Sequence, residues 1–165
     1  MTNPLPGLHH VAYVCRDLDA THHFYADLLG LPLVHTEISQ RGEGWLKHVF
    51  YDLGGGSALA FFALHGMGEP DELKTAVSTD LGLPLWANHI ALRADEARVA
   101  AVKERLAADG IELAMELDHG WCQSHYVVDP NGILVELTVD TPGFEPDEAE
   151  AARLLHQHVE PATSP

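Results

Sequence analysis

Residues 7–14 read Gly-Leu-His-His-Val-Ala-Tyr-Val, and residues 87–92 read Ala-Asn-His-Ile-Ala-Leu. Both stretches alternate apolar side chains with others in the way that is typical of a half-buried β-strand. Each carries a histidine near its start, and these two residues, His10 and His89, are 79 positions apart. Two similar strands at this separation suggest that the chain contains one structural unit twice.

The residues that follow each stretch predict the same order of elements. Apolar side chains at helical spacing fill residues 20–29 and stop at Gly30, and a second helix begins at Asp95 and stops at Gly110. Three strands are predicted after each helix, at residues 33–37, 46–53 and 58–64 and at residues 111–116, 124–128 and 133–139. The sequence therefore predicts an α+β fold made of two tandem βαβββ modules.

Composition divides the chain into four parts that we expect to form one domain. The first module takes residues 1–65 and the second takes residues 86–140. A linker rich in Gly, Pro, Asp and Thr joins them at residues 66–85. Residues 141–165 form an acidic C-terminal helix and tail, in which a run of charges is typical of a solvated face.

Charge and composition exclude several classes of function. The 165 residues include 9 Lys and Arg against 25 Asp and Glu, which gives a net charge of −16 and disfavours nucleic acid and anionic membranes as partners. No apolar run approaches the ~20 residues of a membrane helix, and no signal-peptide pattern is visible. Cys15 and Cys122 form no disulfide framework. We therefore expect a cytoplasmic protein whose partner is a small molecule.

Histidine is unusually frequent, with 12 residues, and this directs attention to metal binding. His10 and His89 lie in the first strand of each module, and Glu136 lies in the last strand of the second. Two imidazoles and a carboxylate bind a divalent first-row metal and leave other coordination positions open. A carboxylate among Ile, Leu and Val side chains is costly to bury unless it has a partner such as a metal. We predict a metal site made of His10, His89 and Glu136.

These residues resemble motifs of the vicinal oxygen chelate superfamily, which includes glyoxalases, bleomycin-resistance proteins and ring-cleaving dioxygenases. The similarity is carried by residues 7–11 (Gly-Leu-His-His-Val), Asp17, residues 24–25 (Phe-Tyr), 28–31 (Leu-Leu-Gly-Leu), 88–89 (Asn-His) and 129–136 (Asp-Pro-Asn-Gly-Ile-Leu-Val-Glu). It covers residues 7–146. It implies a cupped mixed sheet, or half-barrel, around a metal held by His10, His89 and Glu136. It also implies a homodimer.

The resemblance is closest to the ring-cleaving dioxygenases. Glyoxalase lyases of the superfamily usually supply a fourth ligand from the last strand of the first module, where this chain has Leu59 or Ala60. Neither side chain binds a metal, so a site with three protein ligands is favoured. Residues 124–126 (Ser-His-Tyr) and 141–148 (Thr-Pro-Gly-Phe-Glu-Pro-Asp-Glu) are similar to the C-terminal end of hydroquinone-type ring-cleaving dioxygenases.

This second resemblance implies roles for residues beside the metal. His9 would be an acid–base group, and Tyr126, ten positions before Glu136, would orient a substrate oxygen. His119 stands where those enzymes tend to have Arg, in a loop from which it could gate the site or deprotonate the substrate. Alternation along a strand turns His9 away from His10 unless the strand end twists. His48 could also reach the pocket.

We therefore expect an extradiol-type dioxygenase that cleaves a catechol- or hydroquinone-like aromatic ring. Fe(II) is the expected metal, with Mn(II), Ni(II), Co(II) and Zn(II) as the other candidates, and no organic cofactor is expected. One alternative is a glyoxalase-like lyase or an epimerase or isomerase that uses the metal as a Lewis acid. Another is a non-catalytic, drug-binding member of the superfamily. The sequence leaves open whether the modules pair within one chain or across a dimer.

Overall fold

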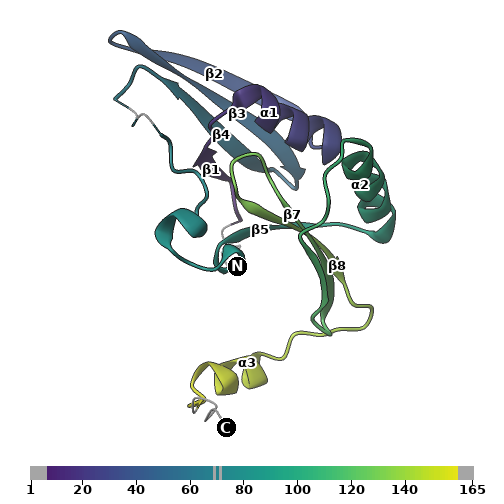
Figure 1. Ribbon diagram of the computed structural model, residues 1–165. Helices are drawn as coiled ribbons and strands as arrows, with labels where there is room; N and C mark the ends of the chain where they lie inside the picture. The colour runs from purple at the N-terminus through teal and green to yellow at the C-terminus, as the bar shows by residue number, and fades with distance from the viewer. Residues whose placement is uncertain (1–6, 69, 71, 160–165) are drawn as a thin grey trace, which may run out of the picture.

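The computed structural model describes residues 7–68, 70 and 72–159. The ends of the predicted first module and tail, residues 1–6 and 160–165, lie outside the described residues. The described chain forms two four-stranded mixed sheets with a few helices, which confirms the predicted α+β fold of tandem βαβββ modules (Figure 1). No helix in the described part is both long and apolar enough to cross a membrane.

The two sheets repeat one strand order. Sheet A has the order β1-β4-β3-β2 and sheet B the order β5-β8-β7-β6. The strands of sheet A are β1 (His10–Val14), β2 (Leu33–Arg41), β3 (Gly44–Gly54) and β4 (Ser57–His65). Those of sheet B are β5 (His89–Arg93), β6 (Met115–Asp118), β7 (Cys122–Val128) and β8 (Leu134–Asp140). In each sheet the first and last strands of the module pair in parallel and the other pairs are antiparallel, which confirms the duplication.

Short helices lie between or after the strands, and an aspartate side chain caps the first turn of each α-helix. The helices are α1 (Leu18–His22), the π-helical η1 (His23–Leu28), the 3-10 turns η2 (Thr79–Leu81) and η3 (Leu85–Ala87), α2 (Glu96–Ala108) and α3 (Glu148–Leu155). Asp17 and Asp95 precede α1 and α2 and accept hydrogen bonds from backbone N–H groups of the first turn. Such caps satisfy amide groups that have no partner within the helix.

One hydrophobic core runs through both modules. The segment α1–η1 lies beside α2 (Figure 1). The Arg98 and Arg105 side chains of α2 donate to backbone carbonyls at the end of η1, with Arg105 Nε 2.6 Å from the Leu28 oxygen. Buried residues of both modules, among them Tyr25 and Ile133, belong to the same cluster. The modules are therefore joined through their helices.

The Asp-Pro-Asn-Gly turn at residues 129–132 has a structural role at this junction. The buried Asp129 carboxylate accepts a hydrogen bond of 2.9 Å from the Tyr25 hydroxyl of η1. The buried Asn131 side chain accepts a hydrogen bond of 3.0 Å from the backbone N–H of Arg16. Since buried polar groups are stable only when they are paired, these contacts fix the second module against the first.

Each sheet packs one face on this core and leaves its other face open. Side chains alternate along a strand, so Val49 and Tyr51 of β3 point into the core while His48 and Phe50 share the opposite face. We call the two core-distant faces the open face of sheet A and the open face of sheet B. Each open face carries one of the predicted histidine ligands.

Candidate metal centre

The open face of sheet B contains a cavity of about 470 Å³. It is lined by His89, Ala91, Arg93, His119, Trp121, Tyr126, Glu136, Thr138 and Asp140. These residues come from β5, β8, β7 and the loop before β7, so the cavity belongs to the second module. Four of them, His89, His119, Tyr126 and Glu136, are site residues predicted from the sequence.

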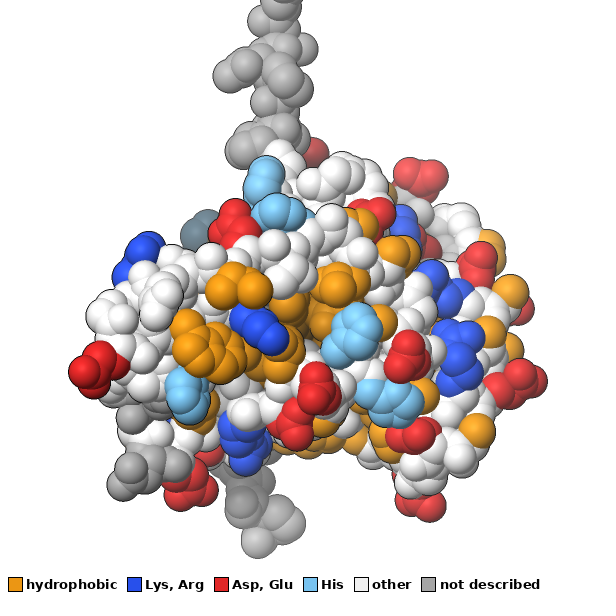
Figure 2. All heavy atoms as spheres, turned by 90° about the horizontal axis from the view of Figure 1, so that it is seen from above, with side chains coloured by type: hydrophobic (Ala, Val, Ile, Leu, Met, Phe, Trp, Pro, Cys, Tyr) orange, Lys and Arg blue, Asp and Glu red, His pale blue; other side chains and the backbone are white. Residues whose placement is uncertain are grey.

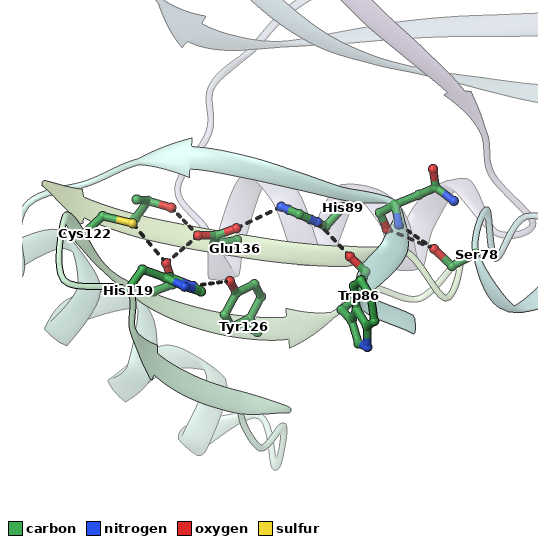
Figure 3. A network of polar contacts seen from close by, with 10 residues as sticks. Ser78, Trp86, His89, His119, Cys122, Tyr126 and Glu136 are labelled. Atoms are coloured by element: carbon green, nitrogen blue, oxygen red, sulfur yellow. Dashed lines mark hydrogen bonds and ion pairs between the residues drawn. The ribbon is translucent and has the colours of Figure 1, made fainter. Parts of the chain in front are cut away.

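His89 and Glu136 lie on adjacent parallel strands. Ala91 of β5 is paired with Glu136 of β8. His89 lies two residues before Ala91 on the same face of β5, so its side chain and the Glu136 carboxylate lie on one face of the sheet. The Nε2 atom of His89 is 3.1 Å from Oε2 of Glu136 (Figure 3). The structure therefore brings two of the three predicted ligands together.

The loop before β5 fixes the orientation of the His89 ring. His89 Nδ1 lies 3.0 Å from the backbone oxygen of Trp86 (Figure 3). A carbonyl oxygen only accepts hydrogen bonds, so Nδ1 is the donor of this contact and Nε2 is the ring atom that faces the carboxylate. The hydroxyl of Ser78 holds the end of this loop in place, because it accepts a 2.8 Å hydrogen bond from the Asn88 backbone N–H. This arrangement is the usual way in which a second contact orients a metal-binding histidine.

The other oxygen of Glu136 is held by two hydroxyl groups. Ser124 of β7 donates a short hydrogen bond to Oε1, and Thr138 donates to the same atom at 2.8 Å. Glu136 is only 5% exposed. Because Oε1 is saturated, Oε2 is the atom that remains for a ligand. Ser124 shares a face of β7 with Tyr126, and this alternation is the signal by which it could have been found in the sequence.

The chemistry of this pair fits a metal ion. Two acceptor atoms 3.1 Å apart repel each other unless a cation or a proton lies between them. Two ligands that each bind a first-row metal at about 2.1 Å, at right angles, are separated by about 3 Å. The side chains of His89 and Glu136 are therefore placed to hold one divalent ion in neighbouring coordination positions.

The third predicted ligand lies on the other sheet. His10 opens β1 on the open face of sheet A, where its ring centroid is 5.6 Å from that of Phe50. The Nδ1 atoms of His9 and His10 are 2.7 Å apart, so the His9 ring turns toward His10 at the strand end. Across the described residues, no three His, Cys, Asp or Glu side chains are grouped so that they could hold one ion. The three-ligand set remains a prediction, and one chain does not assemble it.

Strand register shows which residue of sheet A corresponds to Glu136. In sheet B, the residue two positions after His89 is Ala91, which is paired with Glu136. In sheet A, the residue two positions after His10 is Ala12, which is paired with Ala60. Ala60 is therefore the equivalent position, and Leu59 points into the core. The first module offers no carboxylate at this place.

The sequence predicts only that His48 could reach the pocket, and the structure places its ring between two aromatic rings. Its ring stacks on Phe62 with centroids 3.7 Å apart and lies 4.1 Å from the Phe50 ring. Its Nε2 atom is buried without a hydrogen-bond partner among the described residues. Burial lowers the pKa of His48, so its ring is neutral near pH 7. A buried unpaired nitrogen is costly, and such groups often serve function.

Tyr126 and His119 meet at the edge of the sheet B cavity. His119 Nε2 is 3.1 Å from the Tyr126 hydroxyl (Figure 3). Burial raises the pKa of Tyr126, so its hydroxyl keeps its proton near neutral pH. Two of the three predicted catalytic residues therefore lie with His89 and Glu136, whereas His9 lies beside His10.

The chain matches the family model described as Glyoxalase/Bleomycin resistance protein/Dioxygenase superfamily over residues 7–137. A comparison with the curated proteins finds no match. Several solved structures share the fold. A fosfomycin resistance protein, FosX, from Listeria monocytogenes, complexed with Mn(II) and 1S,2S-dihydroxypropylphosphonic acid, is 22% identical with a TM-score of 0.58, over 84% of this chain and 96% of that one.

Two further solved structures are similar over nearly their whole length. A lactoylglutathione lyase from Agrobacterium tumefaciens is 27% identical with a TM-score of 0.55, over 86% of this chain and 100% of that one. A glyoxylase/bleomycin resistance protein/dioxygenase domain from Frankia sp. EAN1pec is 19% identical with a TM-score of 0.62, over 86% and 96%. At these identities the likeness concerns the fold.

Proposed function

Because the chain belongs to the glyoxalase/bleomycin resistance protein/dioxygenase superfamily, we propose that it is a metal-dependent dioxygenase that cleaves a catechol- or hydroquinone-like ring. The observation that carries the proposal is the pair formed by His89 and Glu136, 3.1 Å apart at a cavity that Tyr126 and His119 also line. The pair supplies a cation site, and the aromatic and phenolic walls suit an aromatic diol.

The ligand set that we propose is His10, His89 and Glu136. Ala60 stands at the position where a fourth ligand would come from the first module, so at most three protein ligands are expected. Three ligands leave positions for both oxygens of a diol and for dioxygen. Fe(II) is the metal that this reaction favours, and the Mn(II) in the FosX complex supports a divalent ion in general.

A second copy of the chain completes this site in our proposal. His10 lies on the open face of sheet A, and the His89–Glu136 pair lies on the open face of sheet B. Both faces point away from the shared core, and the described residues of one chain bring no three ligands together. A homodimer in which the open face of sheet A of one copy covers the sheet B cavity of the other joins the two half-sites.

When bound, the metal supplies Lewis-acid binding of the diol oxygens and the redox chemistry that couples the diol to dioxygen. The hydroxyl of Tyr126, held by His119, orients one substrate oxygen. His48 of the second copy stacks on Phe62 beside His10 and forms part of the aromatic wall next to the metal. His9 orients His10, and Phe50 beside it contributes an aromatic wall.

Charge at the cavity disfavours anionic substrates. Arg93 is the only Lys or Arg among the described lining residues, and its Nη1 atom is 2.6 Å from Oδ2 of Asp140. A phosphonate such as the ligand of the FosX complex needs unpaired cations, which these lining residues do not supply. An uncharged diol meets no such requirement. We place the protein in a reducing cytoplasm, where Fe(II) and the free thiols of Cys15 and Cys122 persist.

Oxygen uptake tests the proposed activity. Protein loaded anaerobically with Fe(II) is mixed with a panel of catechols and hydroquinones, beside the variants Glu136→Ala and Glu112→Ala. Glu112 is a glutamate away from the cavity and serves as the matched control. We expect uptake that Glu136→Ala abolishes and Glu112→Ala leaves unchanged. Metal binding without uptake would instead support the lyase or isomerase alternative, and the absence of both would support a drug-binding protein.

A further inference from the structure

The C-terminal helix α3 is an amphipathic helix that covers no surface of the described residues of its own chain. It stands apart from both sheets (Figure 1), and none of its residues is buried. Leu155 is 78% exposed and Leu154 is 51% exposed. Its polar side chains form hydrogen bonds within residues 147–157. A helix of two turns is marginal in water by itself, so packing elsewhere would stabilise it.

Sheet A carries an apolar surface that none of the described helices covers. The hairpin of β2 and β3 extends beyond α1, and on its core-side face the rows Gln40–Trp45–His65 and Ile38–Lys47–Ala63 lie next to each other. We call Ile38, Trp45, Lys47, Ala63 and His65 the hairpin patch. Ile38 is 71% exposed. Figure 2 looks down on this end of the molecule and shows hydrophobic side chains gathered with a Lys or Arg side chain across them.

Charge makes these two surfaces complementary. Lys47 lies over the Trp45 ring, with Nζ 5.7 Å from its centroid, and the His65 ring stacks on Trp45 at 5.2 Å. The hairpin patch is therefore apolar with one cation, Lys47, lying on it. The segment that carries α3 is acidic, because Arg153 pairs with Glu150 and three further acids remain, namely Glu145, Asp147 and Glu148. Opposite charges at the edge of an apolar contact fix its register and exclude other surfaces.

The two surfaces lie at opposite ends of one chain (Figure 1), so they meet only between copies. The C-terminal segment leaves the body at the sheet B cavity, where the Phe144 ring is 6.0 Å from that of Trp121, a lining residue. Sheet A of a second copy covers this cavity in the dimer described above. The C-terminal segment of one copy thus starts at the edge of the contact between the two copies. It lies beside sheet A of the second copy, whose opposite face carries the hairpin patch.

We propose that α3 of each copy packs on the hairpin patch of the other and clasps the dimer from outside, an inference that rests on the homodimer of the proposed function. Leu154 and Leu155 contact Ile38 and the Trp45 ring, and the acidic start of the helix faces Lys47. The clasp is reciprocal, as a twofold symmetric dimer requires.

Disulfide trapping between two different chains tests this contact. The variants Ile38→Cys and Leu155→Cys are purified separately, mixed to exchange subunits, and oxidised mildly. Both sites are exposed, so the variants keep the fold, and the native Cys15 and Cys122 are buried. The matched control replaces Ile38→Cys by Glu104→Cys, an exposed position on α2 away from the hairpin patch.

We expect covalent dimer from the Ile38→Cys and Leu155→Cys mixture, at least tenfold above the Glu104→Cys mixture and above either variant alone. Sedimentation as a dimer without this cross-link would overturn the clasp while the shared metal site stands. A monomer in sedimentation would overturn both. In a chain that carries both Ile38→Cys and Leu155→Cys, a disulfide within that one chain would also overturn the clasp, because α3 would then cover its own sheet.

Discussion

His48 and Ser124 occupy equivalent positions of the two sheets, His48 paired with Phe62 and Ser124 paired with Thr138. Ser124 donates a hydrogen bond to Glu136, whereas the position of Glu136 is taken by Ala60 in sheet A. In the second module, the Ser124 hydroxyl therefore finds its hydrogen-bond partner, Glu136, within the same chain. The first module keeps an imidazole nitrogen that has no partner among the described residues.

The variant His48→Phe separates the stability of this residue from its function. Phe keeps the stacking on Phe62 and removes the buried unpaired nitrogen, so we expect the free energy of unfolding to rise by about 1 kcal/mol. We expect kcat/KM for the diol to stay within about threefold of the wild-type value, because the buried Nε2 offers no surface to a substrate. Urea denaturation and oxygen uptake measure the two effects. A fall of tenfold or more would show that the substrate reaches His48.

Removal of the carboxylate tests the metal pair directly. We expect Glu136→Gln to weaken Mn(II) binding at least about 100-fold, since an anionic ligand is lost, and Ser124→Ala to weaken it about 10-fold through the orientation of Glu136. Glu116→Gln is the matched control, because Glu116 is an exposed glutamate bound to Lys103. Calorimetric titration with Mn(II) gives the affinities. Equal affinities for Glu136→Gln and Glu116→Gln would contradict the site.

The link between the modules through Tyr25 and Asp129 predicts a stability effect without a binding effect. Tyr25→Phe removes the hydrogen bond of 2.9 Å to a buried carboxylate, and we expect a loss of about 2 kcal/mol of unfolding free energy. Chemical denaturation measures this loss. Mn(II) affinity at the folded protein should stay at its wild-type value, since neither residue lines the cavity. A loss below about 0.5 kcal/mol would mean that the bond contributes little.

His23 gives the junction of the helices a dependence on pH. Hydrogen bonds to Asp27 and then to Asp109 raise the pKa of His23 above 6.5. A histidine whose folded pKa is raised contributes stability that is fully present below its unfolded pKa and is lost as pH rises through the folded pKa. We expect a histidine NMR titration to show the raised pKa and Asp109→Asn to lower it. An unchanged His23 titration in that variant would contradict the link.

The repeat and its strands could be predicted from the sequence because alternation and turn residues are local. The structure differs from these predictions where hydrogen bonds to other segments determine where an element begins or ends. β2 continues to Arg41, past its predicted end at residue 37, because its polar end pairs with β3. β6 begins at Met115 rather than at Ile111, since the Ile111 N–H bonds to the Leu106 oxygen at the end of α2. The predicted helix at 20–29 divides into α1 and the π-helical η1.

The candidate site could be predicted in part for the same reason. His89 and Glu136 belong to adjacent strands of one module, so the strand pattern of that module brings them together. The place of His10 depends on how the modules pack through α1, η1 and α2, and no local pattern encodes that packing. The roles of the Trp86 carbonyl and of Ser124 depend on hydrogen bonds across loops and strands.

The most direct test of the shared metal site is complementation between two variants that each lack one half. His10→Ala and Glu136→Ala are prepared separately, and neither should bind Mn(II) tightly. After subunit exchange, each mixed dimer contains one site whose His10 and Glu136 come from different, intact modules. We predict that Mn(II) binding, followed by electron paramagnetic resonance, returns to about a quarter of the wild-type sites, as random pairing of subunits requires. No recovery from the mixture, although mixed dimers form, would contradict a metal site shared between two copies.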